Sequence, residues 1–207
     1  MPGGVEFVYV DDGSRDGSAE QLLDLAKRDD RIRVLTFEKN SGQTAAFAAG
    51  FEAARGEVVA TLDADLQNDP ADLPRLLAAL DRADVVNGVR ASRQDGFVRK
   101  ISSRIGNGFR NYMTQESVTD VGCSLRVMRA SYLKRVKLYR GMHRFLPTLL
   151  RMEGARVTEL PVSHRPRRHG RSKYGIANRL FVGLADVFAV RWMQARKLSW
   201  RVRNPDA

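Results

Sequence analysis

The sequence predicts an α/β fold, in which a mostly parallel β-sheet is covered by helices on both faces. Short apolar runs rich in β-branched residues alternate with amphipathic stretches along the first half of the chain. Two acidic turns directly follow two of these runs, and parallel sheets bind ligands beyond the carboxyl ends of their strands. A length of 207 residues is enough for one domain with a sizeable core.

The expected elements of the first half follow in order. Strands are predicted at residues 5–10, 32–37, 58–62 and 84–88. Helices are predicted between them at residues 18–26, 42–54 and 73–80. Ser18 and Gln21 form a capping-box pattern at the start of the first helix, and Gly56 follows the end of the second.

The second half is less regular. A basic amphipathic helix is expected at residues 97–113, with Val98, Ile101, Ile105 and Phe109 on one face. Strands are expected at residues 123–128 and 155–162. A short helix is expected at 145–152 and a longer one, which closes the fold, at 178–198. A polar, basic loop at 163–175 lies before the last helix.

Composition excludes several classes of protein. With 43% hydrophobic and 29% charged residues, the chain has the composition of a soluble globular protein and is not disordered. Cys123 is its one cysteine, which excludes a disulfide scaffold, predicts a small buried side chain and favours a reducing compartment. No run is long and apolar enough for a membrane span, and no secretory leader is expected.

The net charge of +11 is unevenly distributed. Residues 1–120 carry 15 basic and 20 acidic side chains, a net of −5, whereas residues 121–207 carry 20 and 4, a net of +16. Such a basic segment attracts nucleic acid, an anionic membrane or a phosphorylated ligand, unless its arginines serve solubility alone. It lacks interleaved aromatic platforms and a reading helix, so no specific nucleic-acid partner is expected.

One acidic turn has the composition of a metal site. Asp63 and Asp65 follow an apolar strand, so both carboxylates can face one point, and Gln67 can add a neutral oxygen. Hard oxygen ligands of this kind suit Mg²⁺ or Mn²⁺. The alternative is a purely structural turn, in which the carboxylates cap the next helix or form Asx turns.

A second acidic turn follows the strand at residues 5–10. A carboxylate of Asp11 or Asp12 can accept a hydrogen bond from a nucleotide base or a ribose hydroxyl there. The sequence D-D-G-S is also favourable for a simple turn. Two such turns at strand ends of one sheet favour a ligand site.

Several motifs together resemble a known family. The chain contains V-D-D-G-S-R-D-G-S, N-S-G-Q-T-A-A-F-A-A-G and D-A-D-L-Q-N-D-P, in the order found in inverting glycosyltransferases of family 2. It also contains V-R-A-S-R-Q-D, T-D-V-G-C-S-L-R and H-R-P-R-R-H-G-R-S-K-Y-G, which resemble the polyprenol-phosphate branch of that family. That branch includes dolichyl-phosphate mannosyltransferases and bacterial undecaprenyl-phosphate glycosyltransferases. The resemblance covers residues 5–180 and implies the GT-A fold, a Rossmann-like nucleotide-diphospho-sugar transferase fold.

The resemblance also implies an activity. A sugar is expected to pass with inversion from a nucleotide donor, UDP rather than GDP, to polyprenyl phosphate in cell-envelope glycan or glycolipid synthesis, with Mg²⁺ or Mn²⁺ as cofactor. It implies that Asp63, Asp65 and Gln67 hold the metal and the diphosphate. The remaining nucleotide-sugar contacts that it implies are Asp11, Asp12 and Arg90. The implied acceptor or phosphate contacts are Arg93, Arg104, Arg126, Arg167, Arg168, Ser172 and Lys173.

The implied catalytic residues are Asp65 and Asp120, and Asp120 resembles a carboxylate proposed as a base. A phosphate monoester has a second pKa near 6, so the acceptor is mostly dianionic at pH 7 and needs little deprotonation. A base is therefore not essential. Asp120 can act as one, or it can instead orient Arg126 or bind the sugar.

The predicted organisation is a catalytic domain over residues 1–177 and a basic amphipathic helix over residues 178–207. The closing helix places Phe188 and Trp192 among arginines, which fits a helix at an anionic membrane surface, whereas the alternative is that these aromatic side chains belong to the core. A lipid-phosphate acceptor then predicts a cytoplasmic protein, peripheral on the inner face of the cytoplasmic membrane. The oligomeric state is not predicted.

The start of the chain differs from the family pattern. Family members open with a strand and a helix before the D-D-G-S turn, and here ten residues precede Asp11. We therefore expect an N-terminally truncated domain that lacks the usual first βα unit. The alternative function is then a catalytically impaired, nucleotide- or lipid-binding fragment or subunit of such a transferase.

Overall fold

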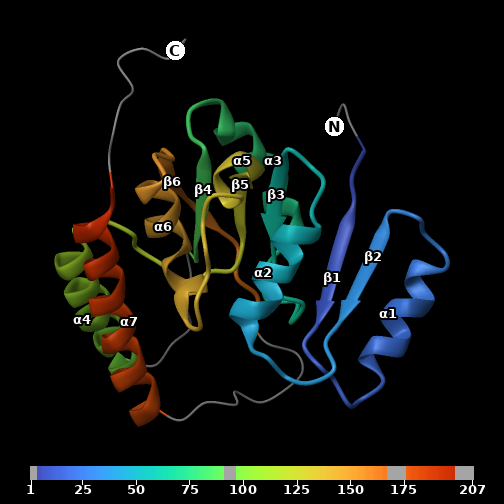
Figure 1. Ribbon diagram of the computed structural model, residues 1–207, viewed down its shortest axis with the longest axis horizontal. Helices are drawn as coiled ribbons and strands as arrows, with labels where there is room; N and C mark the ends of the chain where they lie inside the picture. The colour runs from blue at the N-terminus through green and yellow to red at the C-terminus, as the bar shows by residue number, and fades with distance from the viewer. Residues whose placement is uncertain (1–3, 91–96, 167–175, 199–207) are drawn as a thin grey trace.

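The structure is a computed structural model, and it describes residues 4–90, 97–166 and 176–198. Its strands form two sheets (Figure 1). In the first, β1 (Phe7–Asp11) runs parallel to β2 (Ile32–Thr36). The second has the order β3-β5-β4-β6, made of β3 (Val58–Thr61), β5 (Arg126–Arg129), β4 (Val85–Arg90) and β6 (Val157–Val162).

The direction of β5 is the main departure from a purely parallel sheet. β5 is antiparallel to β3 and to β4, whereas β4 and β6 are parallel. Its register places Arg126, the first residue of β5, opposite Thr61 at the end of β3 and opposite Asn87 in the middle of β4. The predicted class, an α/β fold with a mostly parallel sheet, is confirmed.

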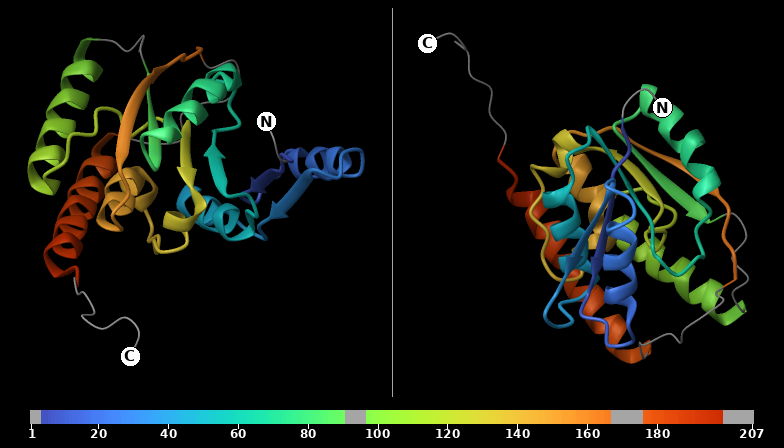
Figure 2. Two further views of the ribbon diagram at one scale, coloured as in Figure 1. Left: turned by 90° about the horizontal axis from the view of Figure 1, so that it is seen from above. Right: turned by 90° about the vertical axis from the view of Figure 1, so that its right-hand side faces the viewer.

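Helices cover both faces of the second sheet, as predicted (Figure 2). α3 (Leu73–Ala78) lies on one face, and α2 (Gln43–Ala53) and α6 (Leu146–Met152) lie on the other. Alternate strand residues supply the two cores: Val86 and Val127 pack with α3, whereas Val85 and Met128 pack with α6. The other helices of the described part are α1 (Ser18–Ala26), α4 (Phe97–Thr114), α5 (Ala130–Leu133), α7 (Ile176–Arg196) and the 3₁₀ turns η1 (Pro70–Asp72), η2 (Ala79–Asp81) and η3 (Met142–Phe145).

The predicted capping box at Ser18 is wrong. Gly17 takes a left-handed backbone conformation with φ 82°, and Ser18 is already the first residue of α1. The Asp16 carboxylate accepts hydrogen bonds from the amide and the hydroxyl of Ser18, at 3.2 and 2.6 Å. Asp16 therefore satisfies the first backbone donor of the helix from outside it.

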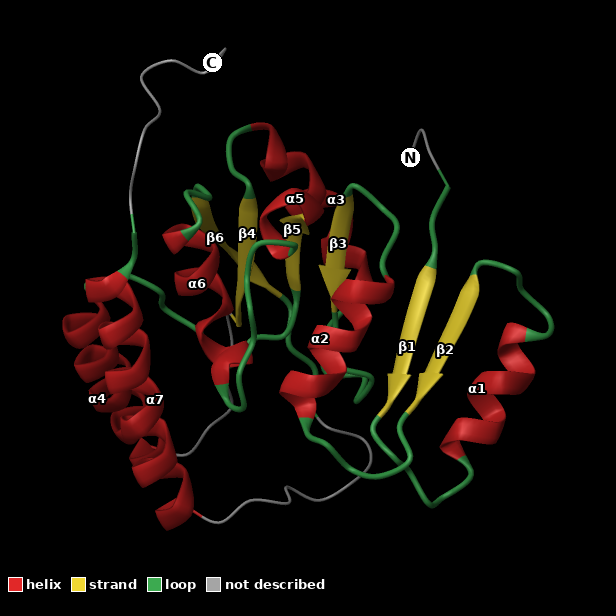
Figure 3. Ribbon diagram, in the orientation of Figure 1, coloured by secondary structure: helices red, strands yellow, loops and turns green. Residues whose placement is uncertain are grey.

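α4 and α7 lie side by side at the end of the molecule farthest from β1 and β2 (Figure 3). The inner face of α7 buries Val187 and Val190 against η3 and α6. Its outer face exposes Phe188 and Trp192 by 55% and 65%. The domain division proposed at residue 177 stays a prediction, but α7 is packed on the rest of the fold.

The predicted apolar face of α4 is also exposed where its side chains are described. Ile105 is 68% exposed and Phe109 is 40% exposed. Arg110, by contrast, is buried and donates hydrogen bonds to the carbonyl of Val118 and to the side-chain oxygens of Asn107 and Asn111. The inward side of α4 therefore includes Arg110 with its hydrogen bonds made, whereas Ile105 and Phe109 face outward.

Within the described residues, no strand pairing joins β1 to β3, although the two strands point the same way (Figure 3). The two sheets are connected by α2, whose Gly50 approaches Val10, and by the Glu6 carboxylate. Glu6 accepts hydrogen bonds from the amides of Arg55 and Gly56, at 2.6 and 3.1 Å. The expected truncation before β1 stays a prediction.

Candidate active site

The turn after β3 brings the three predicted metal ligands together. Asp63, Asp65 and Gln67 line one cavity of about 30 Å³, which is large enough for a water molecule. The backbone N–H of Gln67 donates a hydrogen bond of 3.1 Å to Asp65 Oδ1, and Leu66 between them has a positive φ of 62°. This tight reversal allows residues 63, 65 and 67 to face the same space.

The ligand set suits a divalent cation. Burial raises the pKa of Asp63, and the charge of Asp65 raises it further, so a cation would relieve the cost of holding two carboxylates together. In the part of the chain that the structure describes, no group of three or more His, Cys, Asp or Glu side chains forms a metal site. The candidate ligands are therefore two carboxylates, of Asp63 and Asp65, and the amide oxygen of Gln67. These three would leave coordination positions for water and phosphate oxygens, as Mg²⁺ and Mn²⁺ require.

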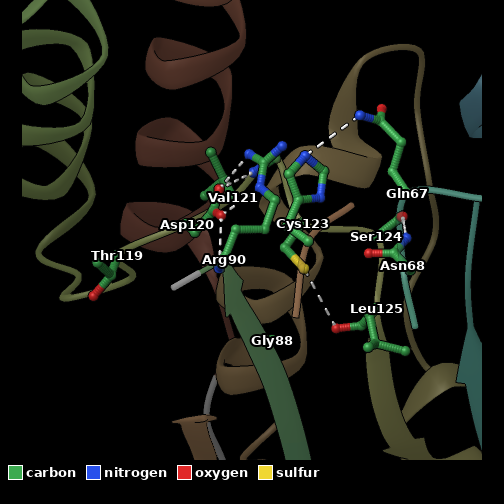
Figure 4. A network of polar contacts seen from close by, with 12 residues as sticks. Gln67, Asn68, Gly88, Arg90, Thr119, Asp120, Val121, Cys123, Ser124 and Leu125 are labelled. Carbon is green, nitrogen blue, oxygen red and sulfur yellow. Dashed lines mark hydrogen bonds and ion pairs between the residues drawn. The ribbon is translucent and has the colours of Figure 1, made fainter. Parts of the chain in front are cut away.

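Arg90, at the end of β4, is the cationic side chain of the same cavity. Its Nε lies 2.7 Å from Asp120 Oδ2, and its Nη2 lies 2.8 Å from Asp120 Oδ1, in a largely buried bidentate ion pair (Figure 4). The Gly122 amide also donates to Asp120 Oδ1 at 3.1 Å. Both carboxylate oxygens of Asp120 therefore hold Arg90 in place.

The loop after Asp120 passes close to β4 because glycine allows it. A Cβ on Gly88 would lie 2.7 Å from the Leu125 carbonyl oxygen and 3.1 Å from Cys123 Sγ (Figure 4). Cys123 is 1% exposed, and burial raises the pKa of its thiol. The prediction that Cys123 is a small buried side chain is confirmed.

Ser124 joins the loop to the metal-site turn. Its Oγ accepts hydrogen bonds from the Asp63 amide at 3.1 Å and from Asn68 Nδ2 at 2.7 Å. Its carbonyl accepts from Thr61 Oγ1 at 2.6 Å. Both ends of the 63–68 turn are thus fixed to one residue of the C-S-L-R segment.

The predicted nucleotide contacts Asp11 and Asp12 lie in the turn after β1. Asp11 is buried and accepts from the Ser14 amide at 3.0 Å. The Asp12 carboxylate accepts from the amides of Ser41 and Gly42, at 2.6 and 2.9 Å, at the start of α2. Asp11 closes the turn on itself, Asp12 fixes the turn against the start of α2, and the contact of both residues with a nucleotide stays a prediction.

Arg126 has a structural set of contacts. It is 2% exposed, and its Nε donates to Asn87 Oδ1 at 2.8 Å. Its two terminal nitrogens donate to the carbonyls of His143 and Val121, at 3.1 and 2.9 Å. These bonds favour a role in holding the loop and η3 over direct phosphate binding, which stays a prediction.

A second cavity of about 630 Å³ adjoins the first. Asp63, Gly122, Cys123 and Ser124 line both cavities. The larger one extends between the first turns of α2 and the segment 138–144 as far as Asp186 on α7. Its volume is in the range of small-molecule sites.

Several predicted acceptor contacts lie outside the described residues, namely Arg93, Arg167, Arg168, Ser172 and Lys173. Arg104 belongs to α4, but its side chain is also outside the described part. His164, by contrast, was not predicted: it lines the small cavity, and its Nε2 lies 3.4 Å from Gln67 Nε2. A one-residue bridge between Asn68 and His164 brings it there, across almost a hundred residues of sequence that no motif spacing connects.

This fold and this acidic turn define the GT-A class of glycosyltransferases. Residues 2–137 match the model of glycosyl transferase family 2, and the chain belongs to that family. Among solved structures, it resembles glucosyl-3-phosphoglycerate synthase from Mycobacterium tuberculosis in complex with Mn²⁺, uridine diphosphate and glucosyl-3-phosphoglycerate. The TM-score is 0.65 with 16% identity, over 94% of this chain and 70% of that one.

Two curated relatives are more similar in sequence. The dodecaprenyl-phosphate galacturonate synthase of Rhizobium johnstonii is 40% identical over 93% of this chain and 58% of its own length. The undecaprenyl-phosphate 4-deoxy-4-formamido-L-arabinose transferase of Edwardsiella ictaluri is 43% identical over 83% of this chain and 53% of its own. The resemblance to the polyprenol-phosphate branch is confirmed, and the chain spans somewhat more than half the length of these relatives.

Proposed function

We propose that this chain transfers a sugar, with inversion, from a nucleotide donor to polyprenyl phosphate. The observation that carries the proposal is the shared cavity of Asp63, Asp65, Gln67 and Arg90 at the ends of β3 and β4. The two curated relatives, a dodecaprenyl-phosphate galacturonate synthase and an undecaprenyl-phosphate 4-deoxy-4-formamido-L-arabinose transferase, support this acceptor class.

The chemistry follows from charge. An acceptor phosphate oxygen forms a bond to the anomeric carbon while the bond from that carbon to the nucleoside diphosphate breaks. A divalent cation held by Asp63, Asp65 and Gln67 would supply positive charge to the leaving diphosphate. Arg90, held by Asp120, adds a fixed positive charge beside the same space. Because the acceptor is already mostly dianionic at pH 7, positioning contributes more than proton removal.

The donor and acceptor contacts are part of the proposal. Asp11 and Asp12 bind the nucleoside, and uridine is favoured over guanosine because it is the more usual donor base among the bacterial members of the branch that this chain resembles. The basic residues predicted from the family pattern bind the phosphates of donor and acceptor. Mg²⁺ and Mn²⁺ both fit the oxygen ligands.

We further propose that the protein acts at the inner face of the cytoplasmic membrane. Searching the described helices for a membrane span returns none with the necessary length and hydrophobicity. The adjacent helices α4 and α7 each expose apolar side chains, which are Ile105, Phe109 and Tyr112 on α4 and Phe188 and Trp192 on α7. With the basic second half of the chain, these exposed side chains suit an anionic lipid headgroup region.

Calorimetry and a transfer assay test the proposed function. We expect the purified chain to bind UDP more tightly with Mn²⁺ than without it, and more tightly than GDP. Asp65→Ala should abolish metal-dependent binding and sugar transfer to undecaprenyl phosphate, while Asp30→Ala, on an exposed turn, should leave both unchanged. Transfer by Asp65→Ala at the wild-type rate would overturn the metal assignment. Nucleotide binding without any transfer would favour the impaired-fragment alternative.

A further inference from the structure

Gln43, the first residue of α2, reaches across to the metal-site turn. Its Nε2 donates a hydrogen bond of 2.9 Å to Asp63 Oδ1. The Asp63 amide is fixed separately by Ser124 Oγ at 3.1 Å. The main chain and one carboxylate oxygen of Asp63 are therefore each fixed by a residue from another part of the sequence.

We propose that Gln43 is a positioning residue of the cation site, which holds the Asp63 carboxylate in the orientation that binds the divalent ion. This inference rests on the proposed function. With Oδ1 accepting the hydrogen bond from Gln43, the Asp63 carboxylate is held in one orientation, in which it would bind the cation. An amide suits this role because it donates a hydrogen bond without bringing a positive charge that would compete with the ion.

The first turn of α2 is rigid enough to place Gln43. Asp12 accepts from the amides of Ser41 and Gly42 immediately before it. Thr44, immediately after Gln43, is buried. Its Oγ1 accepts a hydrogen bond of 3.0 Å from the backbone N–H of Gly141 and lies 2.7 Å from His143 Nδ1. Gln43 thus stands between two anchors, one on the β1 turn and one on the segment that leads into η3.

The same contacts connect the two acidic turns of the sequence. Asp12 belongs to the turn after β1, and Asp63 to the turn after β3, in a different sheet. The residues at the start of α2 touch both. A shift of this helix start would therefore move the cation site and the proposed nucleoside site together.

The test is a titration of the full chain with Mn²⁺ alone, following free Mn²⁺ by electron paramagnetic resonance. Gln43→Met keeps the length of the side chain and removes the donor. We expect it to weaken Mn²⁺ binding by about 10–100-fold, the usual effect of losing a group that orients a metal ligand. Gln43 is exposed, so its thermal unfolding should match that of the wild type. Gln21→Met, on the exposed surface of α1, is the matched control and should bind Mn²⁺ like the wild type.

The outcomes separate this inference from the function on which it rests. Equal Mn²⁺ affinity in Gln43→Met and wild type would overturn the role of Gln43 and leave the cation site standing. A Gln43→Met chain with normal Mn²⁺ affinity but weaker UDP binding would also overturn it, because Gln43 would then contact the nucleotide. Absence of Mn²⁺ binding by the wild type would overturn both proposals.

Discussion

Gly122 has no side chain, and the guanidinium of Arg90 occupies the space that a side chain there would fill. A Cβ at residue 122 would lie 2.7 Å from Arg90 Nη2, which is closer than real contacts allow. Gly122→Ala should therefore displace the guanidinium and lower the transfer rate by about 10–100-fold, since a displacement of about 1 Å can have that effect. Gly106→Ala, where nothing lies within 4 Å, is the control and should stabilise α4 by roughly 0.5–1 kcal/mol. A Gly122→Ala chain with the wild-type rate would show that Arg90 has no part in transfer.

The Asp120–Arg90 pair distinguishes a positioning role from a catalytic base. The side chains are 8% and 14% exposed, so Asp120→Asn leaves a buried guanidinium without its counter-charge. We expect the free energy of unfolding to fall by about 3–5 kcal/mol, together with the loss of transfer. Urea unfolding measures the first, and the transfer assay the second. Lost transfer with unchanged stability would instead indicate a base.

At this scale, residue spacing found the site residues that share a short segment, and the family resemblance added Arg90, but other residues that tertiary contacts bring in were not predicted. Asp63, Asp65 and Gln67 are two residues apart and follow a strand, so their convergence was predictable. Ser124, Gln43 and His164 come from three other parts of the chain. Serine, glutamine and histidine have no distinctive spacing to these aspartates, and only the packed fold shows that they meet.

At the scale of elements, Asp84 holds three strands together. It stands before β4 and accepts hydrogen bonds from the amide and the guanidinium of Arg156, before β6, and it pairs with Arg129 of β5. Hydrogen bonding from Arg156 is the main cause that lowers the pKa of Asp84 below its ordinary value of 3.8.

A lowered pKa fixes the sign of the pH dependence. The stabilisation by Asp84 is complete above its ordinary pKa and is lost as the pH falls through the lower value of the folded state. Asp84→Asn should therefore unfold at a lower urea concentration than the wild type at pH 7. The difference should shrink progressively below about pH 4. A difference that stays constant between pH 7 and pH 3 would contradict this account.

Element positions were predicted within a few residues, because periodicity and turn residues are local properties. The direction of β5 is not local: it depends on where the chain re-enters the sheet after α4. The capping box failed for a related reason, because a left-handed Gly17 shifted the helix start and made Asp16 the acceptor. The same pattern of residues fits either arrangement until the backbone is placed.

At the scale of the whole molecule, charge and exposed apolar surface predict membrane association. Trp192→Ser should lower the fraction of chain bound to anionic phospholipid vesicles by about tenfold, because burial of a large side chain contributes roughly 1.5–3 kcal/mol. Flotation with vesicles measures that fraction. Leu25→Ser, which is exposed on α1 at the other end of the molecule, is the control. Binding should also weaken near 1 M salt, where the Debye length is about 3 Å. Equal flotation of all three chains would remove α7 from the membrane contact.

The separation of β1 and β2 from the larger sheet has a consequence for how the molecule opens. Residues 4–42 contain one buried side chain, that of Asp11, whereas the apolar clusters of the fold are built from later elements. In the described part of the chain, no strand pairs with the edge of β1 that faces away from β2. Amide hydrogens of β1, β2 and α1 should therefore exchange with deuterated solvent through a local opening well below the global free energy of unfolding. Such exchange would show that the D-D-G-S turn opens in a cooperative unit of its own, once its hydrogen bonds to the start of α2 are broken, while the Asp-x-Asp turn stays in place.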